Sequence, residues 1–291
     1  MYSHQKGSPF YKNGASCQYN NRMRLRRLSS TPINTNSQFN WLFVLPGALL
    51  AVFFGVPLLA LFLRAIGQDF WAYALSDSAL AALKLSLVTS SLSVGISLLA
   101  GTPLAYLLAR WEFRGKAIIE VLVDLPVVLP PAVAGLALLM AFGRQGVFGG
   151  WLAGFGISLP FTTAAVVIAQ TFVSAPLYVR AARIGFAEVD PQLEEAAHVE
   201  GATPWQVFRE VMLPLAGRAL IGGAILAWTR ALGEFGATIL FAGNIEGVTQ
   251  TMPLAIYLGF ERSLGAAVVL SVILAIVCLI VLAIIRRLDR L

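Results

Sequence analysis

Six apolar segments, each long enough to cross a bilayer as a helix, dominate the pattern of hydrophobic and polar residues along the chain. A hydrocarbon core of about 30 Å needs roughly 20 apolar residues in a helix. We therefore expect six transmembrane helices, at residues 41–63, 85–109, 125–142, 161–179, 219–242 and 263–285. Small residues let membrane helices approach closely, so a packed bundle is expected around Gly95, Gly101, Gly135, Gly222 and Gly223.

Composition agrees with a membrane protein. Hydrophobic residues make up 58% of the chain and charged residues 12%, against about 45–50% and about 25% in soluble domains. A disordered chain would be poorer in apolar side chains and richer in charge. The two cysteines are too few for a disulfide framework. The predicted fold class is an all-α membrane protein.

The distribution of Lys and Arg predicts the orientation. With a cytoplasmic N-terminus, 16 basic residues fall on cytoplasmic segments and 4 on external ones. Positive charge is enriched on the cytoplasmic side of membrane proteins. We therefore expect both termini inside, in a plasma (inner) membrane, and a cytoplasmic segment at residues 188–214.

The formal charge of +6 comes from the first 40 residues, which carry six basic and no acidic side chains. The rest of the chain carries 15 of each sign, so the charge is not the basic patch of a nucleic-acid-binding surface. Residues 1–40 are too polar to form a packed core, and we expect a disordered tail. It is either a cytoplasmic extension or an organelle transit peptide, which would place the protein in an organelle inner envelope.

The polar segment 188–214, called the 188–214 loop below, predicts two short helices joined by a bend. Asp190 is suited to the N-cap of the first helix. Gly201 fits the position after that helix, where a left-handed backbone is needed. Thr203 and Gln206 have the spacing of a capping box at the start of the second helix.

The same loop resembles the EAA motif of ATP-binding-cassette (ABC) importer permeases. The matching residues are Glu195, Ala196, Ala197, Gly201, Leu213 and Pro214. In that family the loop forms coupling helices that insert into a cleft of the cytoplasmic ATPase. The resemblance implies that Glu195 serves docking and that Gly201 serves the bend. The alternative is an ordinary surface helix-turn-helix between two spans.

Further segments are similar to molybdate-type permeases within this family, namely residues 125–139, 230–238, 241–244 and 251–257. Sulfate-type and tungstate permeases share much of the pattern. The resemblance covers residues 41–291 and implies a type I permease bundle surrounded by lipid. It also implies a homodimer, two ATPase subunits and an external oxyanion-binding protein that supplies most of the selectivity.

Two charges interrupt the fifth apolar segment. Arg230 and Glu234 are four residues apart, so they share one face of a helix. Charges within a span are costly and normally face the bundle interior. Either they form a polar wall of a translocation path, with Arg230 contacting an anion, or they are a buried pair that fixes packing.

Two acids, Glu120 and Asp124, lie one turn apart where the third span enters the membrane. An acidic vestibule is awkward for an anion path. We expect a structural role, with Arg114 or Lys116 as partners.

The chain shows no nucleotide-binding motif of its own. Its one Gly-Lys pair lacks the other residues of a phosphate-binding P-loop. ATP and Mg²⁺ are therefore expected on a separate ATPase, with no cofactor, metal or catalytic residue here. The predicted function is the permease subunit of an ATP-driven oxyanion importer that works by alternating access. An ion-driven secondary transporter would predict paired halves and ion-coordinating broken helices, and a membrane enzyme would need a catalytic constellation.

Overall fold

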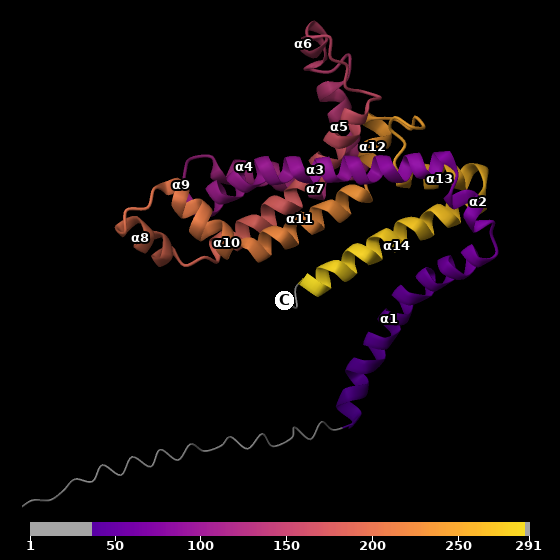
Figure 1. Ribbon diagram of the computed structural model, residues 1–291, viewed down its shortest axis with the longest axis horizontal. Coiled ribbons are helices and arrows are strands. Elements are labelled where there is room, and N and C mark those ends of the chain that lie inside the picture. Colours follow the sequence, from indigo (N-terminus) through magenta and orange to yellow (C-terminus); the bar gives the residue numbers. More distant parts are fainter. Residues whose placement is uncertain (1–36, 289–291) are drawn as a thin grey trace, which may run out of the picture. The chain divides into compact units, whose positions relative to one another are not determined.

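A computed structural model describes residues 37–288, and all of its elements are helices within that range (Figure 1). The tail predicted for residues 1–40 lies outside the described residues, except that helix α1 already begins at Ser37. The chain divides into two units after Phe54. Within the described residues the first unit is the first part of α1, and all helices after α1 belong to the second unit.

Four helices in the described part of the chain are long and apolar enough to cross a membrane. They are α1 (Ser37–Ile66), α3 (Asp77–Arg110), α7 (Thr163–Ala187) and α14 (Leu264–Leu288). Two bent pairs of helices raise the number to six if each pair counts as one span. The first pair, Lys116–Val128 with Pro131–Phe142, lies at the third predicted span. The second pair, Pro204–Leu215 with Gly217–Leu232, is bent by 71° and joins the end of the 188–214 loop to the first part of the fifth predicted span.

The third predicted span is not one helix. Helix α4 (Lys116–Val128) and helix α5 (Pro131–Phe142) meet at an angle of 120°. Leu129 and Pro130 have extended backbones between them. A residue before proline is disfavoured in the helical region, whereas proline is favoured at the first helical position. Two successive prolines therefore end α4 and start α5.

The fifth predicted span is also interrupted. Helix α11 (Gly217–Leu232) ends one residue before Gly233, and the short helix α12 (Gly236–Phe241) follows. A further helix, α13 (Met252–Arg262), starts with a proline in its first turn and precedes α14. Hydropathy alone did not separate α11 from α12, because only Gly233, Glu234 and Phe235 lie between them.

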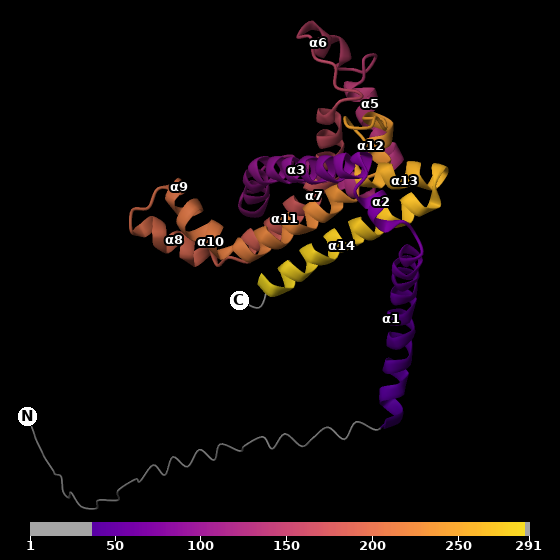
Figure 2. The ribbon, with the colours of Figure 1, turned by 45° about the vertical axis from the view of Figure 1, so that its right-hand side comes forward.

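Helix α7 lies at the centre of the second unit and packs against α3, α11, α12 and α4. Figures 1 and 2 show α3, α7 and α11 running side by side. One buried cluster joins α3, α7 and the 188–214 loop around Leu108, Tyr178 and Phe186. A second joins α5, α7 and α12 around Leu138, Val166 and Phe241. The loop is therefore part of the packed body of the protein.

Three of the five predicted glycine contacts are confirmed. A Cβ on Gly135 would lie 2.8 Å from the backbone of α12, and one on Gly223 would lie 2.7 Å from a side chain of α7. A Cβ on Gly101 would lie 2.9 Å from an aromatic ring of α7. The prediction is wrong for Gly95 and Gly222, where nothing lies within 4 Å.

Candidate functional site

The first helix of the 188–214 loop, α8 (Pro191–Val199), begins where the sequence predicts. The Asp190 side chain accepts a hydrogen bond of 2.9 Å from the N–H of Gln192. Pro191 occupies the first helical position, where its missing N–H costs nothing. The predicted N-cap is thus confirmed, and α8 has its own start signal independent of α7.

A glycine ends α8 in the left-handed conformation. Gly201 has a φ of +88°, and its N–H donates to the carbonyl of His198 over 3.0 Å. The next N–H, of Ala202, donates to the carbonyl of Ala197 over 3.0 Å. This pair of bonds is the Schellman motif, so the predicted bend at Gly201 is confirmed.

The second helical segment starts with the predicted capping box. The Gln206 N–H donates to the Thr203 hydroxyl over 3.4 Å, and the Thr203 N–H donates to the Gln206 side chain over 2.8 Å. Helix α9 (Pro204–Gln206) continues into the π-helix η1 (Val207–Met212) and α10 (Leu213–Leu215). The π-helix was not predicted.

The six motif residues divide into an exposed group and a packed group. Glu195, Ala196, Gly201 and Pro214 are exposed. Ala197 and Leu213 are half-buried and pack on the buried cluster that joins the loop to α3 and α7. One face of α8 is therefore fixed to the protein body while the face that carries Glu195 points away from it.

Two apolar side chains extend the exposed surface of this loop. Leu193 is 47% exposed and Val199 is 88% exposed. Trp205, at the start of the second segment, is 65% exposed. Scattered apolar residues are normal on a surface, but Val199 lies one turn from Glu195 on the same exposed face of α8. Leu193, one turn before Ala197, borders the anchored face instead.

Sequence analysis missed Arg110, the last residue of α3. Its Nε lies 2.7 Å from a carboxylate oxygen of Glu194 in α8. Its Nη2 donates to the carbonyl of Val189 over 2.6 Å and contacts the sulfur of Met212 at 3.8 Å. The side chain is only 13% exposed. No sequence pattern marks this residue, because its partners lie 79 to 102 positions away.

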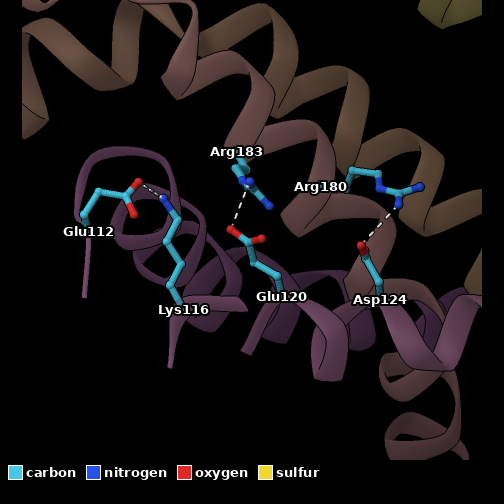
Figure 3. A network of polar contacts seen from close by, with 6 residues as sticks. All are labelled: Glu112, Lys116, Glu120, Asp124, Arg180 and Arg183. Carbon is cyan, nitrogen blue, oxygen red and sulfur yellow. Dashed lines mark hydrogen bonds and ion pairs between the residues drawn. The ribbon is translucent and has the colours of Figure 1, made fainter. Parts of the chain in front are cut away.

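Two ion pairs join α4 to α7 (Figure 3). Glu120 lies 2.9 Å from Arg183, and Asp124 lies 3.2 Å from Arg180. All four side chains are 25% to 60% exposed. Each acid is thus matched by an arginine one helix away, so this end of α4 carries no unbalanced negative charge.

The partners predicted for these acids are wrong. Lys116 pairs instead with Glu112, four residues earlier, at 2.5 Å. Figure 3 shows this pair apart from the two that bridge α4 and α7. The sequence indicated the nearest basic residues along the chain, whereas the packing of α4 on α7 brings arginines from another helix.

Arg230 and Glu234 form an ion pair of 2.6 Å across the end of α11. Glu234 is 1% exposed, and its second oxygen accepts a hydrogen bond of 2.8 Å from the N–H of Ala237 in α12. The carboxylate thus joins the end of one helix to the start of the next. These contacts support the interpretation of Arg230 and Glu234 as a buried pair that fixes packing. A contact of Arg230 with substrate stays a prediction.

Residues 101–291 match the family described as the binding-protein-dependent transport system inner membrane component. This range contains α7, the 188–214 loop and all later helices. The chain belongs to this family, whose members are non-catalytic subunits of ABC importers, and it is a multi-pass protein of the inner membrane.

Several known proteins resemble the chain. The molybdenum transport system permease protein ModB of Mycobacterium tuberculosis is 43% identical, with 83% of this chain and 91% of the relative covered. The sulfate transport system permease protein CysT of Escherichia coli is 38% identical, with 71% and 76% covered. A bacterial alginate ABC transporter, solved with an alginate pentasaccharide-bound periplasmic protein, gives a TM-score of 0.71 at 19% identity, with 87% and 94% covered. This fold likeness, with the family match, confirms the predicted type I ABC importer permease.

Proposed function

We propose that this chain is the membrane-spanning permease subunit of an ATP-driven importer that takes molybdate from an extracytoplasmic binding protein. The family and the relative at 43% identity support the class and the substrate. The relative named as a sulfate permease, at 38% identity, keeps sulfate as the second candidate. Tungstate, which has nearly the same shape and charge as molybdate, is the third.

The observation that carries the proposal is the outward face of α8. Glu195 and Val199 are four residues apart, so they share one exposed face of α8, which is capped at both ends. Glu194 and Ala197 hold the other side of the helix to the protein body. An amphipathic helix with such anchors docks into an apolar groove of a partner. A cytoplasmic ATPase subunit is the partner that fits, because this chain has no P-loop for the nucleotide.

The mechanism follows from that docking. Two copies of the chain would bind two ATPase subunits, which hold ATP and Mg²⁺. ATP binding would close the ATPases and shift α8, and the packed helices would switch between inward-facing and outward-facing states. Such a switch needs only contacts that differ between two states, so this chain performs no covalent chemistry.

The charge pattern is compatible with an anion. The acids Glu120 and Asp124, which alone would repel an oxyanion, are paired with Arg183 and Arg180. Opposite charges within about 4 Å largely cancel at longer range. The ion pairs thus remove the objection that the sequence raises against an anion path near α4.

Uptake by reconstituted vesicles tests the substrate. The chain, its ATPase and its binding protein are placed in liposomes with radiolabelled molybdate, ATP, and either no competitor or an excess of sulfate or tungstate. We expect uptake that needs the binding protein, falls with tungstate and persists in sulfate. Block of uptake by the excess of sulfate would contradict the assignment to molybdate and favour sulfate, and uptake without the binding protein would contradict the proposal.

The remaining expectations concern location and the tail. The relatives named above are bacterial, which fits an inner-membrane location. The cytoplasmic position of both termini rests on the distribution of Lys and Arg alone. No nucleic-acid partner is proposed. The transit-peptide interpretation of residues 1–40 stays a prediction on residues outside the described range.

A further inference from the structure

Arg110 joins three separate parts of the 188–214 loop to the end of α3. It reaches Val189 ahead of α8, Glu194 within α8, and Met212 in the π-helix. These partners come from both sides of the bend at Gly201. One side chain thus holds both halves of the loop against one membrane helix.

The surroundings of Arg110 make this junction stiff. Val189, Met212 and Val207 of the loop are at most 7% exposed and share a buried cluster with Leu108 of α3. The side chains of Arg110 and Glu194 are 13% and 18% exposed. Charges that are shielded from water interact more strongly than exposed ones.

We propose that Arg110 is a positioning residue that transmits movement of α8 to α3. This inference rests on the proposed function, because it assumes that an ATPase moves α8. The two neighbouring glutamates then have separate tasks. Glu195 faces outward toward the partner, and Glu194 faces inward to Arg110. A displacement of α8 moves α3 with it, because the Arg110 side chain at the end of α3 is bound to Glu194 on the inward side of α8.

The contacts favour arginine at this position. The guanidinium spreads its charge over three nitrogens, and two of them are engaged at once: Nε lies 2.7 Å from Glu194 in an ion pair, and Nη2 donates a hydrogen bond to Val189. Lysine has one nitrogen on a flexible stem. Arg110→Lys would keep the charge but lose the double attachment, and its effect should lie between wild type and Arg110→Ala.

The test compares coupling in the whole complex. Arg110→Ala, Arg110→Lys and Glu194→Gln are each reconstituted with ATPase and binding protein, and assembly, basal ATP hydrolysis and uptake per ATP hydrolysed are measured. Glu112→Gln, which breaks an exposed ion pair with Lys116, is the matched control.

We expect assembly and basal hydrolysis to stay near wild type. Uptake per ATP should fall about tenfold in Arg110→Ala, within the 5–150-fold range of typical coupling between sites. It should fall less in Arg110→Lys and Glu194→Gln, and not at all in the Glu112→Gln control. An Arg110→Ala variant that keeps wild-type uptake per ATP, or that loses assembly with the ATPase, would overturn the inference.

If Arg110→Ala does not fold, exchanging the charges of residues 110 and 194 provides a second test. Arg110→Glu alone places two acids together, and adding Glu194→Arg restores the ion pair without the bond to Val189. Uptake per ATP should recover in part in the double variant, and no recovery would count against the inference. If the wild-type complex itself shows no ATP-dependent uptake, the proposed function fails instead, so the two failures are distinguishable.

Discussion

Replacing Gly201 with alanine should loosen the bend between the two helical segments of the 188–214 loop without disturbing any packing. Gly201 has a φ of +88°, and a Cβ built on it meets no atom within 4 Å. The whole penalty therefore comes from the backbone. A residue with a Cβ in the left-handed region costs about 1–2 kcal/mol, which makes local opening of the loop about 5–30 times more frequent.

Hydrogen exchange measured by mass spectrometry reports this opening directly. The amides of Gly201 and Ala202 donate to carbonyls of α8, so they should exchange about 5–30 times faster in Gly201→Ala. Gly201→Asn should change less, because asparagine tolerates positive φ. Gly222→Ala in α11, a glycine that also has open space around it, is the control and should not alter the loop. Unchanged exchange in Gly201→Ala would refute the backbone argument.

Three further sets of substitutions test the packing. Glu234→Ala should lower stability by about 2–3 kcal/mol, since it leaves a cation and a helix N–H without their buried partner, while Glu234→Gln should cost less; thermal unfolding in detergent would show the order. Gly135→Ala should cost about 1–3 kcal/mol because its Cβ meets the backbone of α12, whereas Gly95→Ala, in open space, should cost nothing in the same assay. Glu120→Gln and Asp124→Asn should each cost less than about 1 kcal/mol because these pairs are partly exposed, and a larger loss that persists in high salt would contradict that interpretation.

Local signals in the sequence predicted the loop well. The capping residues Asp190, Thr203 and Gly201 act through neighbours within four positions, so their chemistry is visible in a short string. The long apolar runs likewise predicted α1, α3, α7 and α14, because length and hydropathy suffice to identify a spanning helix.

The rest depends on which helices meet, and the sequence alone did not show that. The break between α4 and α5 is marked by Pro130 and Pro131, but prolines also occur within unbroken membrane helices, as Pro103 does in α3. The partners of Glu120 and Arg110 lie on other elements and became visible only once α4 and the loop were placed beside α7 and α3. Long-range pairs of this kind follow from packing.

The outward face of α8 is the surface on which the proposed function depends most. Family membership indicates that the chain works with a binding protein, and the exposed Glu195 gives the point at which an ATPase is proposed to dock. The variant Glu195→Gln should uncouple hydrolysis from uptake while leaving the affinity for the binding protein unchanged. If the variant and the wild type take up the same amount of substrate per ATP hydrolysed, Glu195 is not the point at which the ATPase docks.

The energy source of uptake tests the central claim most directly. Vesicles that hold the chain with its ATPase and binding protein are supplied either with ATP and no ion gradient, or with a proton or sodium gradient and no ATP. The permease account predicts accumulation of molybdate with ATP alone and none with a gradient alone. Accumulation driven by a gradient in the absence of ATP would contradict it and would identify a secondary transporter.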